Sequence, residues 1–307
     1  MSRSRIALIS VKARPYPLRS FSLSNTFKPK ARLMSYKSIL LNLDIDSPIE
    51  PLTRAGIDLA RRFGARLIGF CAADAPLPVT MAPEGAALAA ELWDQSRDEI
   101  RKRFKDMHGE FNSLVGRSVS SEWRDSVENP DHALASSSRL ADLIVTSASQ
   151  GAFTGDSYRK ANPGSLVLRA GRPVLVAAHG TAHIPTGRIV VAWKDTREAR
   201  RAVADAVPLM AMASEVTVVA VDRDPDGWVR DSIRDVTSFL AGHGIEARTE
   251  ILKSGDEANR LIDFLASVNA ELIVSGAYGH SRLREWVFGG VTRSLFDEVW
   301  LNRLMSS

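Results

Sequence analysis

The chain has a single cysteine and no apolar run long enough to cross a membrane. Cys71 is the one cysteine among 307 residues, so an internal disulfide is excluded and a reducing compartment, the cytoplasm, is expected. Its apolar neighbours predict a buried thiol. A membrane-spanning helix needs about 20 consecutive apolar residues, and the sequence contains no such run. We therefore expect no membrane partner.

Acidic residues are absent from the first 33 positions. That segment contains eight lysines and arginines and lacks the apolar stretch of a secretion signal. We interpret residues 1–33 as a basic, disordered extension; a transit peptide and a translation start at Met34 are the alternatives. The whole chain carries +4 and this segment +8, so residues 34–307 carry −4. A mildly acidic folded region argues against nucleic acid as a partner.

The sequence also lacks the motifs of common catalytic sites. It has no Gly-x-Ser-x-Gly elbow, and no Gly-Lys-Ser/Thr that would end a Walker A loop. His179 and His183 lie four residues apart, but no helix or cysteine cluster accompanies them, so no metal site is predicted. Because no acids, bases or nucleophiles are placed together at strand ends, we expect the protein not to be an enzyme.

Apolar runs alternate with helical patterns from Met34 onward, and the alternation occurs twice. Ser38–Leu43 and Arg188–Trp193 open the two copies as buried strands, and Asp142-Leu-Ile-Val145 matches Glu271-Leu-Ile-Val274 at the fourth strand. Such alternation is typical of parallel sheets with helices on both faces. We predict two tandem α/β domains, each a doubly wound, Rossmann-like parallel sheet. The N-terminal domain occupies residues 34–177, a linker 178–187, and the C-terminal domain 188–307.

Two segments of this pattern are less regular than the rest. Residues 86–108 predict a long helix, with Leu88 and Leu92 on its apolar side. Trp300–Met305 is a poor candidate for a fifth strand, because Asn302 and Arg303 interrupt its apolar run. The pattern therefore gives little support for a strand at the C-terminal edge.

A glycine-rich stretch follows the fourth strand of the second copy. Its marked residues are Gly276, Gly279, Gly289, Gly290 and Thr292, with the spacing Gly-x2-Gly-x9-Gly for the first three. A glycine loop between a strand and a helix directs backbone N–H groups at one point and suits an anion such as phosphate. Together with Arg282 and Arg284, this spacing resembles the nucleotide loop of the universal stress protein (UspA) family. A turn with a helix cap and no ligand is the alternative.

The resemblance covers residues 34 to about 306 and implies a stress-response protein whose two domains pack as a family dimer would. Family members that bind ATP use an aspartate at the end of the first strand, the glycine loop, and a hydroxyl at the next helix start. The resemblance therefore implies an adenine nucleotide, ATP or a similar one. Any Mg²⁺ would arrive with the nucleotide.

The C-terminal copy keeps the glycine loop but not the aspartate. The simplest register places Lys194 at the aspartate position, and a shift of one residue would place Asp195 there. Lysine pairs with phosphate but does not accept a hydrogen bond as a carboxylate does. His280, inside the loop, is a further candidate for a phosphate contact, with a solvated loop histidine as the simpler alternative.

The N-terminal copy keeps the aspartate, Asp44, but not the glycines. Ser147 and Gln150 stand where the first two glycines belong, and Gly164-Ser165 survives near the next helix at altered spacing. Side chains at positions 147 and 150 would fill space that phosphates need. We predict a degenerate site in this copy.

The resemblance and the residues together favour a non-catalytic stress-response protein that binds an adenine nucleotide in its C-terminal domain. Weak ATP hydrolysis is left open. The alternative is a nucleotide-free module of the same fold that acts through protein–protein contacts or dimerisation. In either case we expect a monomer or a homodimer of tandem chains, and an unidentified protein partner.

Overall fold

A computed structural model describes residues 35–78, 85–148, 156–277, 291, 294–295 and 298–307. The candidate residues Gly279, His280, Gly289, Gly290 and Thr292 lie outside these ranges. Residues 34–307 form one compact unit. No helix within the described ranges is long and apolar enough to cross a membrane.

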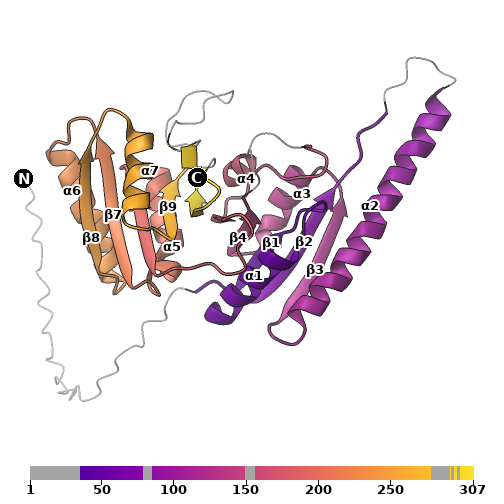
Figure 1. The fold of residues 1–307 in the computed structure, drawn as a ribbon, viewed down its shortest axis with the longest axis horizontal. Helices are drawn as coiled ribbons and strands as arrows, with labels where there is room; N and C mark the ends of the chain where they lie inside the picture. The colour runs from indigo at the N-terminus through magenta and orange to yellow at the C-terminus, as the bar shows by residue number, and fades with distance from the viewer. Residues whose placement is uncertain (1–34, 79–84, 149–155, 278–290, 292–293, 296–297) are drawn as a thin grey trace, which may run out of the picture. The chain divides into compact units, whose positions relative to one another are not determined.

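Ten strands of the described chain form one sheet, in the order β3-β2-β1-β4-β5-β10-β9-β6-β7-β8 (Figure 1). Their bounds are β1 Ser38–Asn42, β2 Arg66–Ala73, β3 Ser121–Val127, β4 Leu143–Ser147, β5 Val174–Ala177, β6 Arg188–Ala192, β7 Glu215–Asp222, β8 Ala247–Lys253, β9 Leu272–Gly276 and β10 Asn302–Ser306. The order 3-2-1-4-5 of the first five strands recurs from the other edge as 8-7-6-9-10. All neighbours are parallel except β5 and β10. The predicted fold class, a tandem pair of doubly wound parallel sheets, is confirmed, while the predicted domain boundaries remain predictions.

Helices cover both faces of this sheet. Their bounds are α1 Glu50–Phe63, α2 Ala86–Val115, α3 Pro130–Ser137, α4 Pro163–Arg169, α5 Arg197–Met210, α6 Gly227–Gly242 and α7 Glu257–Ser267, with a short 3-10 turn at Ser138–Leu140. The helices α1, α2, α5 and α6 share one apolar core, and α3, α4 and α7 share the other. Because both faces are covered, strands such as β1, β5 and β6 have apolar residues at their centres.

Local sequence sets where these helices begin and end. Thr196 and Asp256 accept hydrogen bonds from the backbone of the first turns of α5 and α7, as N-cap residues do. Helix α1 ends at Gly64, whose φ of 62° is the left-handed conformation that glycine adopts without a steric penalty. The chain can therefore turn directly into β2.

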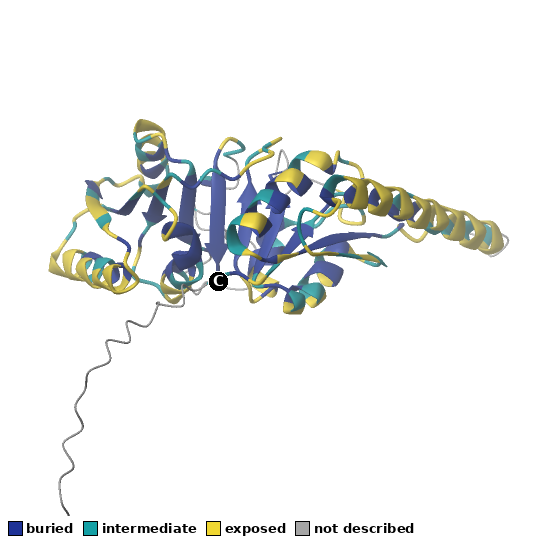
Figure 2. Ribbon diagram, turned by 90° about the horizontal axis from the view of Figure 1, so that it is seen from below, coloured by how far each residue is buried: buried dark blue, intermediate teal, exposed yellow. Residues whose placement is uncertain are grey.

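Helix α2 is longer than expected and half of it leaves the sheet. It runs to Val115 rather than to residue 108, and its buried residues begin only at Ile100. Leu88 and Leu92, expected on an apolar side, are 61% and 49% exposed. Figure 2 shows the first turns of α2 as exposed, in contrast to the buried strands. The periodicity predicts a helix there but does not show that the first half of the helix is exposed.

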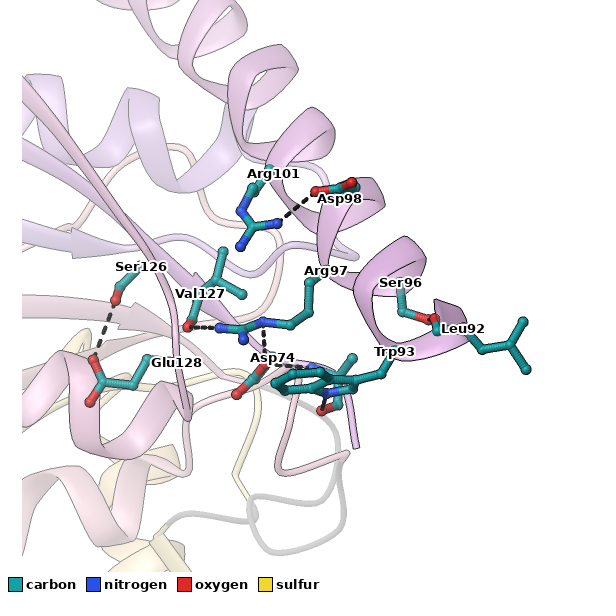
Figure 3. A network of polar contacts seen from close by, with 11 residues as sticks. Asp74, Leu92, Trp93, Ser96, Arg97, Asp98, Arg101, Ser126, Val127 and Glu128 are labelled. Carbon is teal, nitrogen blue, oxygen red and sulfur yellow. Dashed lines mark hydrogen bonds and ion pairs between the residues drawn. The ribbon is translucent and has the colours of Figure 1, made fainter. Parts of the chain in front are cut away.

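A small polar network fastens α2 to the sheet at the point where it departs (Figure 3). Arg97 donates to the carbonyl of Val127 at 3.0 Å and pairs with Asp74 at 3.4 Å. Its guanidinium lies 4.5 Å from the ring centroid of Trp93, whose indole N–H donates to the carbonyl of Ala75. The ends of β2 and β3 are thereby tied to one turn of α2.

The C-terminal segment forms a strand in the middle of the sheet, so the expectation of a poor strand is wrong. Strand β10 pairs with β9 and, in antiparallel register, with β5, where Leu304 faces Leu175. Asn302 accepts from the N–H of Ala178 and donates to the carbonyl of Glu271, both at 2.9 Å. Arg303 is fully buried. Its Nη1 donates to the carbonyl oxygens of Leu295 and Glu298.

Removal of residues 1–33 is expected to change the melting temperature by less than about 2 °C, because the segment offers little apolar surface to a core. Differential scanning calorimetry of the full chain and the truncated chain would check this. A fall of more than about 5 °C, which for a protein of this size is above 1 kcal/mol, would show that the segment packs on the folded part.

Candidate functional site

The sheet contains two equivalent points at which its strand order reverses, between β1 and β4 and between β6 and β9. In doubly wound sheets ligands bind at such points, beyond the carboxyl ends of the strands. The N–H of Leu43 donates to Phe70 and that of Trp193 to Val219, each at 2.8 Å. These matching bonds place Asp44 and Lys194 at equivalent positions, one residue further along.

The N-terminal reversal point is held together by ion pairs. Asp44 pairs with Lys160 at 3.0 Å and accepts from the Ser47 hydroxyl at 3.0 Å. Arg159 donates to both carboxylate oxygens of Asp46, at 2.6 and 2.7 Å. The hydrogen bond from Arg159 holds the pKa of Asp46 below its ordinary value, and the same bond raises the pKa of Arg159. This pair therefore stabilises the fold above the ordinary carboxyl pKa and loses that contribution as the pH falls through the lowered one.

Little space is left beside these ion pairs. A cavity of about 20 Å³ lies among Asp44, Thr146, Ser147, Lys160 and Pro163, which is about the room that one water needs. Gly164 and Ser165, the retained pair, lie in the first turn of α4. The N–H of Ser165 donates to the side chain of Asn162 at 3.0 Å. The start of α4 is thus already capped from within the chain.

A larger cavity of about 570 Å³ opens on the α1 side of the same point. Residues of the predicted linker, Ala178 to Thr181, form one wall of it, and Ile49 and Leu52 form another. Among the described residues, its charged lining consists of Asp44 and Asp156 against Lys160, a net charge of −1. A nucleotide phosphate would be repelled by that surplus carboxylate.

At the C-terminal reversal point, Gly276 ends β9 against the first turn of α5. A Cβ atom at this position would lie 2.5 Å from the N of Ala199 and 2.7 Å from the carbonyl carbon of Glu198. Both atoms belong to the backbone, which cannot move aside as a side chain can. The close approach of α5 therefore requires glycine here, whether or not a ligand binds.

Lys194 and Asp195, the two candidates for the aspartate position, reach opposite faces of the sheet. The Lys194 ammonium pairs with Glu257 at the start of α7, at 3.1 Å. Asp195 pairs with Arg200 of α5 at 2.7 Å. Lys194, Glu257 and Arg200 are all more than a third exposed, so both pairs are weak and can be displaced.

The sequence interpretation missed the residues that close the N-terminal point, namely Asp46, Arg159, Lys160 and Asn162. The signal was an Arg-Lys pair followed by Asn162-Pro163, a typical helix start. Two further sequence candidates were the thiol of Cys71 and a metal site at His179 and His183. Burial raises the pKa of the Cys71 thiol, and within the described ranges no three His, Cys, Asp or Glu side chains converge as metal ligands would.

The described geometry can be compared with proteins of known structure. No protein-family model and no curated protein sequence matches the chain. A universal stress protein from Archaeoglobus fulgidus DSM 4304 superposes with a TM-score of 0.67 at 15% identity, covering 88% of this chain and 98% of that one. A protein of unknown function from Pseudomonas aeruginosa PAO1 gives 0.50 at 19% identity, covering 88% and 92%. The expected likeness is confirmed at the level of fold: the chain has the fold of a universal stress protein structure over most of its length.

Proposed function

We propose that this chain is a non-catalytic stress-response protein that binds an adenine nucleotide, such as ATP, at its C-terminal reversal point. The observation that carries the proposal is the contrast between two equivalent points of one sheet. At the N-terminal point, ion pairs and a capped helix leave about 20 Å³ beside Lys160, and the larger cavity next to them is lined by more described carboxylates than cations. At the C-terminal point, Gly276 leads into the sequence that contains Gly279, Gly289 and Thr292.

Lys194 fits a phosphate ligand better than a base. It stands where the N-terminal half has Asp44, and its present partner, Glu257, is exposed. A phosphate could replace that carboxylate at little cost. A lysine does not accept hydrogen bonds from adenine or ribose, so we expect weak selectivity for adenine over other bases.

Replacing Gly279 with valine is expected to weaken ATP binding by at least about tenfold, because a branched side chain would occupy the space of a phosphate. The matched control is Gln150→Val, at the equivalent loop position of the other half, which should leave binding unchanged. Isothermal titration calorimetry with ATP measures the affinity of both variants. In a separate assay, phosphate release from ATP by the parent protein should not exceed that in buffer.

Two outcomes would contradict this proposal. Binding lost in Gln150→Val but kept in Gly279→Val would move the nucleotide to the N-terminal half. No binding to the parent protein at millimolar ATP would favour the alternative, a nucleotide-free interaction module. Native mass spectrometry would report a homodimer, a protein partner or a retained nucleotide by mass, all three of which stay predictions.

A further inference from the structure

A groove of about 440 Å³ lies between α5 and α6, on the face of the sheet that these helices share with α1 and α2. This volume is in the range of small-molecule sites. The lining combines apolar and acidic side chains. It consists of Trp193, Asp195, Arg200, Val203, Ala204, Trp228, Asp231, Ser232, Asp235, Val236 and Phe239.

The groove exists because α6 does not fill the space that its counterpart fills. In the first half, α1 and α2 pack on each other, and α2 buries Phe104, Met107 and Phe111 there. Helix α6 offers only Ile233, Val236 and Leu240 as buried residues, and α5 and α6 make no more than marginal contact. Smaller side chains on a shorter helix thus leave an opening at this place.

Two of the three aromatic side chains that line the groove, Trp228 and Phe239, are exposed, and the third, Trp193, belongs to the core. Trp228, in the first turn of α6, is 70% exposed, and Phe239, three turns further along, is 43% exposed. Trp193 forms the inner end and donates its indole N–H to the hydroxyl of Ser232 at 3.2 Å. Exposed aromatic rings beside a hollow are costly to leave in water and available to a ligand.

The groove is also acidic. Among the described residues, three carboxylates, Asp195, Asp231 and Asp235, line it against one cation, Arg200, for a net charge of −2. Arg200 pairs with Asp195, and Asp231 pairs with the exposed Arg234. Asp235 forms no ion pair within the described ranges and is exposed on the same helix face as Asp231.

From this combination we propose that the groove binds a hydrophobic organic cation. The apolar body of such a ligand would rest on Trp228, Phe239 and Val236, and its positive charge would face the aromatic rings and Asp235. Aromatic rings attract cations through their faces, and the surplus carboxylates add to that attraction. The same carboxylates oppose an anion, so this site differs in ligand class from the proposed nucleotide site and does not depend on it.

The test is calorimetric titration of the full chain with tetraphenylphosphonium at low ionic strength. Tetraphenylborate, with nearly the same shape and the opposite charge, is the control ligand. We expect the cation to bind and the borate not to bind. Trp228→Ala should weaken binding of the cation by about five- to thirtyfold. Asp231→Asn combined with Asp235→Asn should weaken it by about three- to tenfold.

Matched variants elsewhere on the molecule distinguish binding in the groove from non-specific binding of the cation to other exposed side chains. Trp300→Ala removes another exposed tryptophan, and Asp263→Asn removes an exposed carboxylate of α7 on the opposite face; neither should change the affinity. All replaced residues are exposed, so unchanged melting temperatures should accompany every variant. The proposal is overturned by no binding of the cation, by equal binding of the borate, or by equal losses in the control variants.

Discussion

Replacing Arg303 with alanine is expected to lower the free energy of unfolding by about 3–5 kcal/mol. Arg303 is fully buried in β10, between the two halves of the sheet. Its Nη1 donates to the carbonyl oxygens of Leu295 and Glu298, at 2.5 and 2.8 Å. The alanine variant would leave these two carbonyls without their donor and open a cavity the size of the long side chain. Each of these losses is destabilising by itself.

Urea denaturation followed by circular dichroism would measure this loss. Arg248→Ala is the matched control, because Arg248 also lies in a strand but forms an exposed ion pair with Glu215; its loss should be below about 1 kcal/mol. Arg303→Met keeps most of the side-chain volume and should fall between the two. A change of less than about 1 kcal/mol in Arg303→Ala would mean that the guanidinium contributes little to the join between β5 and β10.

Strand β10 shows where sequence patterns stop being informative. Asn302 and Arg303 interrupt an apolar run, and a pattern that considers neighbours along the chain treats them as breakers. The hydrogen-bond partners of Asn302, Ala178 and Glu271, lie 124 and 31 residues away along the chain. A buried strand tolerates polar side chains when distant groups satisfy them. The periodicity holds no information about those groups, so the error was of a kind that the sequence alone could not correct.

Most of the remaining fold could be predicted, because its causes are local or repeated. The doubly covered strands β1 and β9 carry the apolar runs Ile39–Leu41 and Leu272–Val274. The repeat of Asp142–Val145 in Glu271–Val274 identified the second copy. The candidate site was harder to predict from the sequence. Its loss in the first half depends on Lys160 reaching Asp44 and Arg159 reaching Asp46, 113 residues apart. Such pairs are set by the tertiary fold and not by spacing.

The sequence and the structure give different reasons for the glycine at position 276. The loop spacing attributes this glycine to ligand approach. The structure instead brings the backbone of Ala199 within 2.5 Å of where a Cβ would lie. Contacts of that length do not occur between such atoms, so strand β9 and helix α5 would have to move apart. The two explanations differ in what they expect of the protein without any nucleotide.

Gly276→Ala is therefore expected to destabilise the nucleotide-free protein by about 3 kcal/mol, the upper part of the range for overpacked sites. Urea denaturation in the absence of nucleotide would measure it. The control is Gly109→Ala in α2, where a Cβ meets nothing within 4 Å, and where alanine should stabilise by about 0.5–1 kcal/mol. If Gly276→Ala leaves stability unchanged, α5 yields readily and the packing explanation fails. If stability falls as expected, any loss of nucleotide binding in Gly276→Ala would be explained by the displacement of α5. Contact with the ligand would then have to be tested at Gly279, where a substitution can be compared for binding separately from folding.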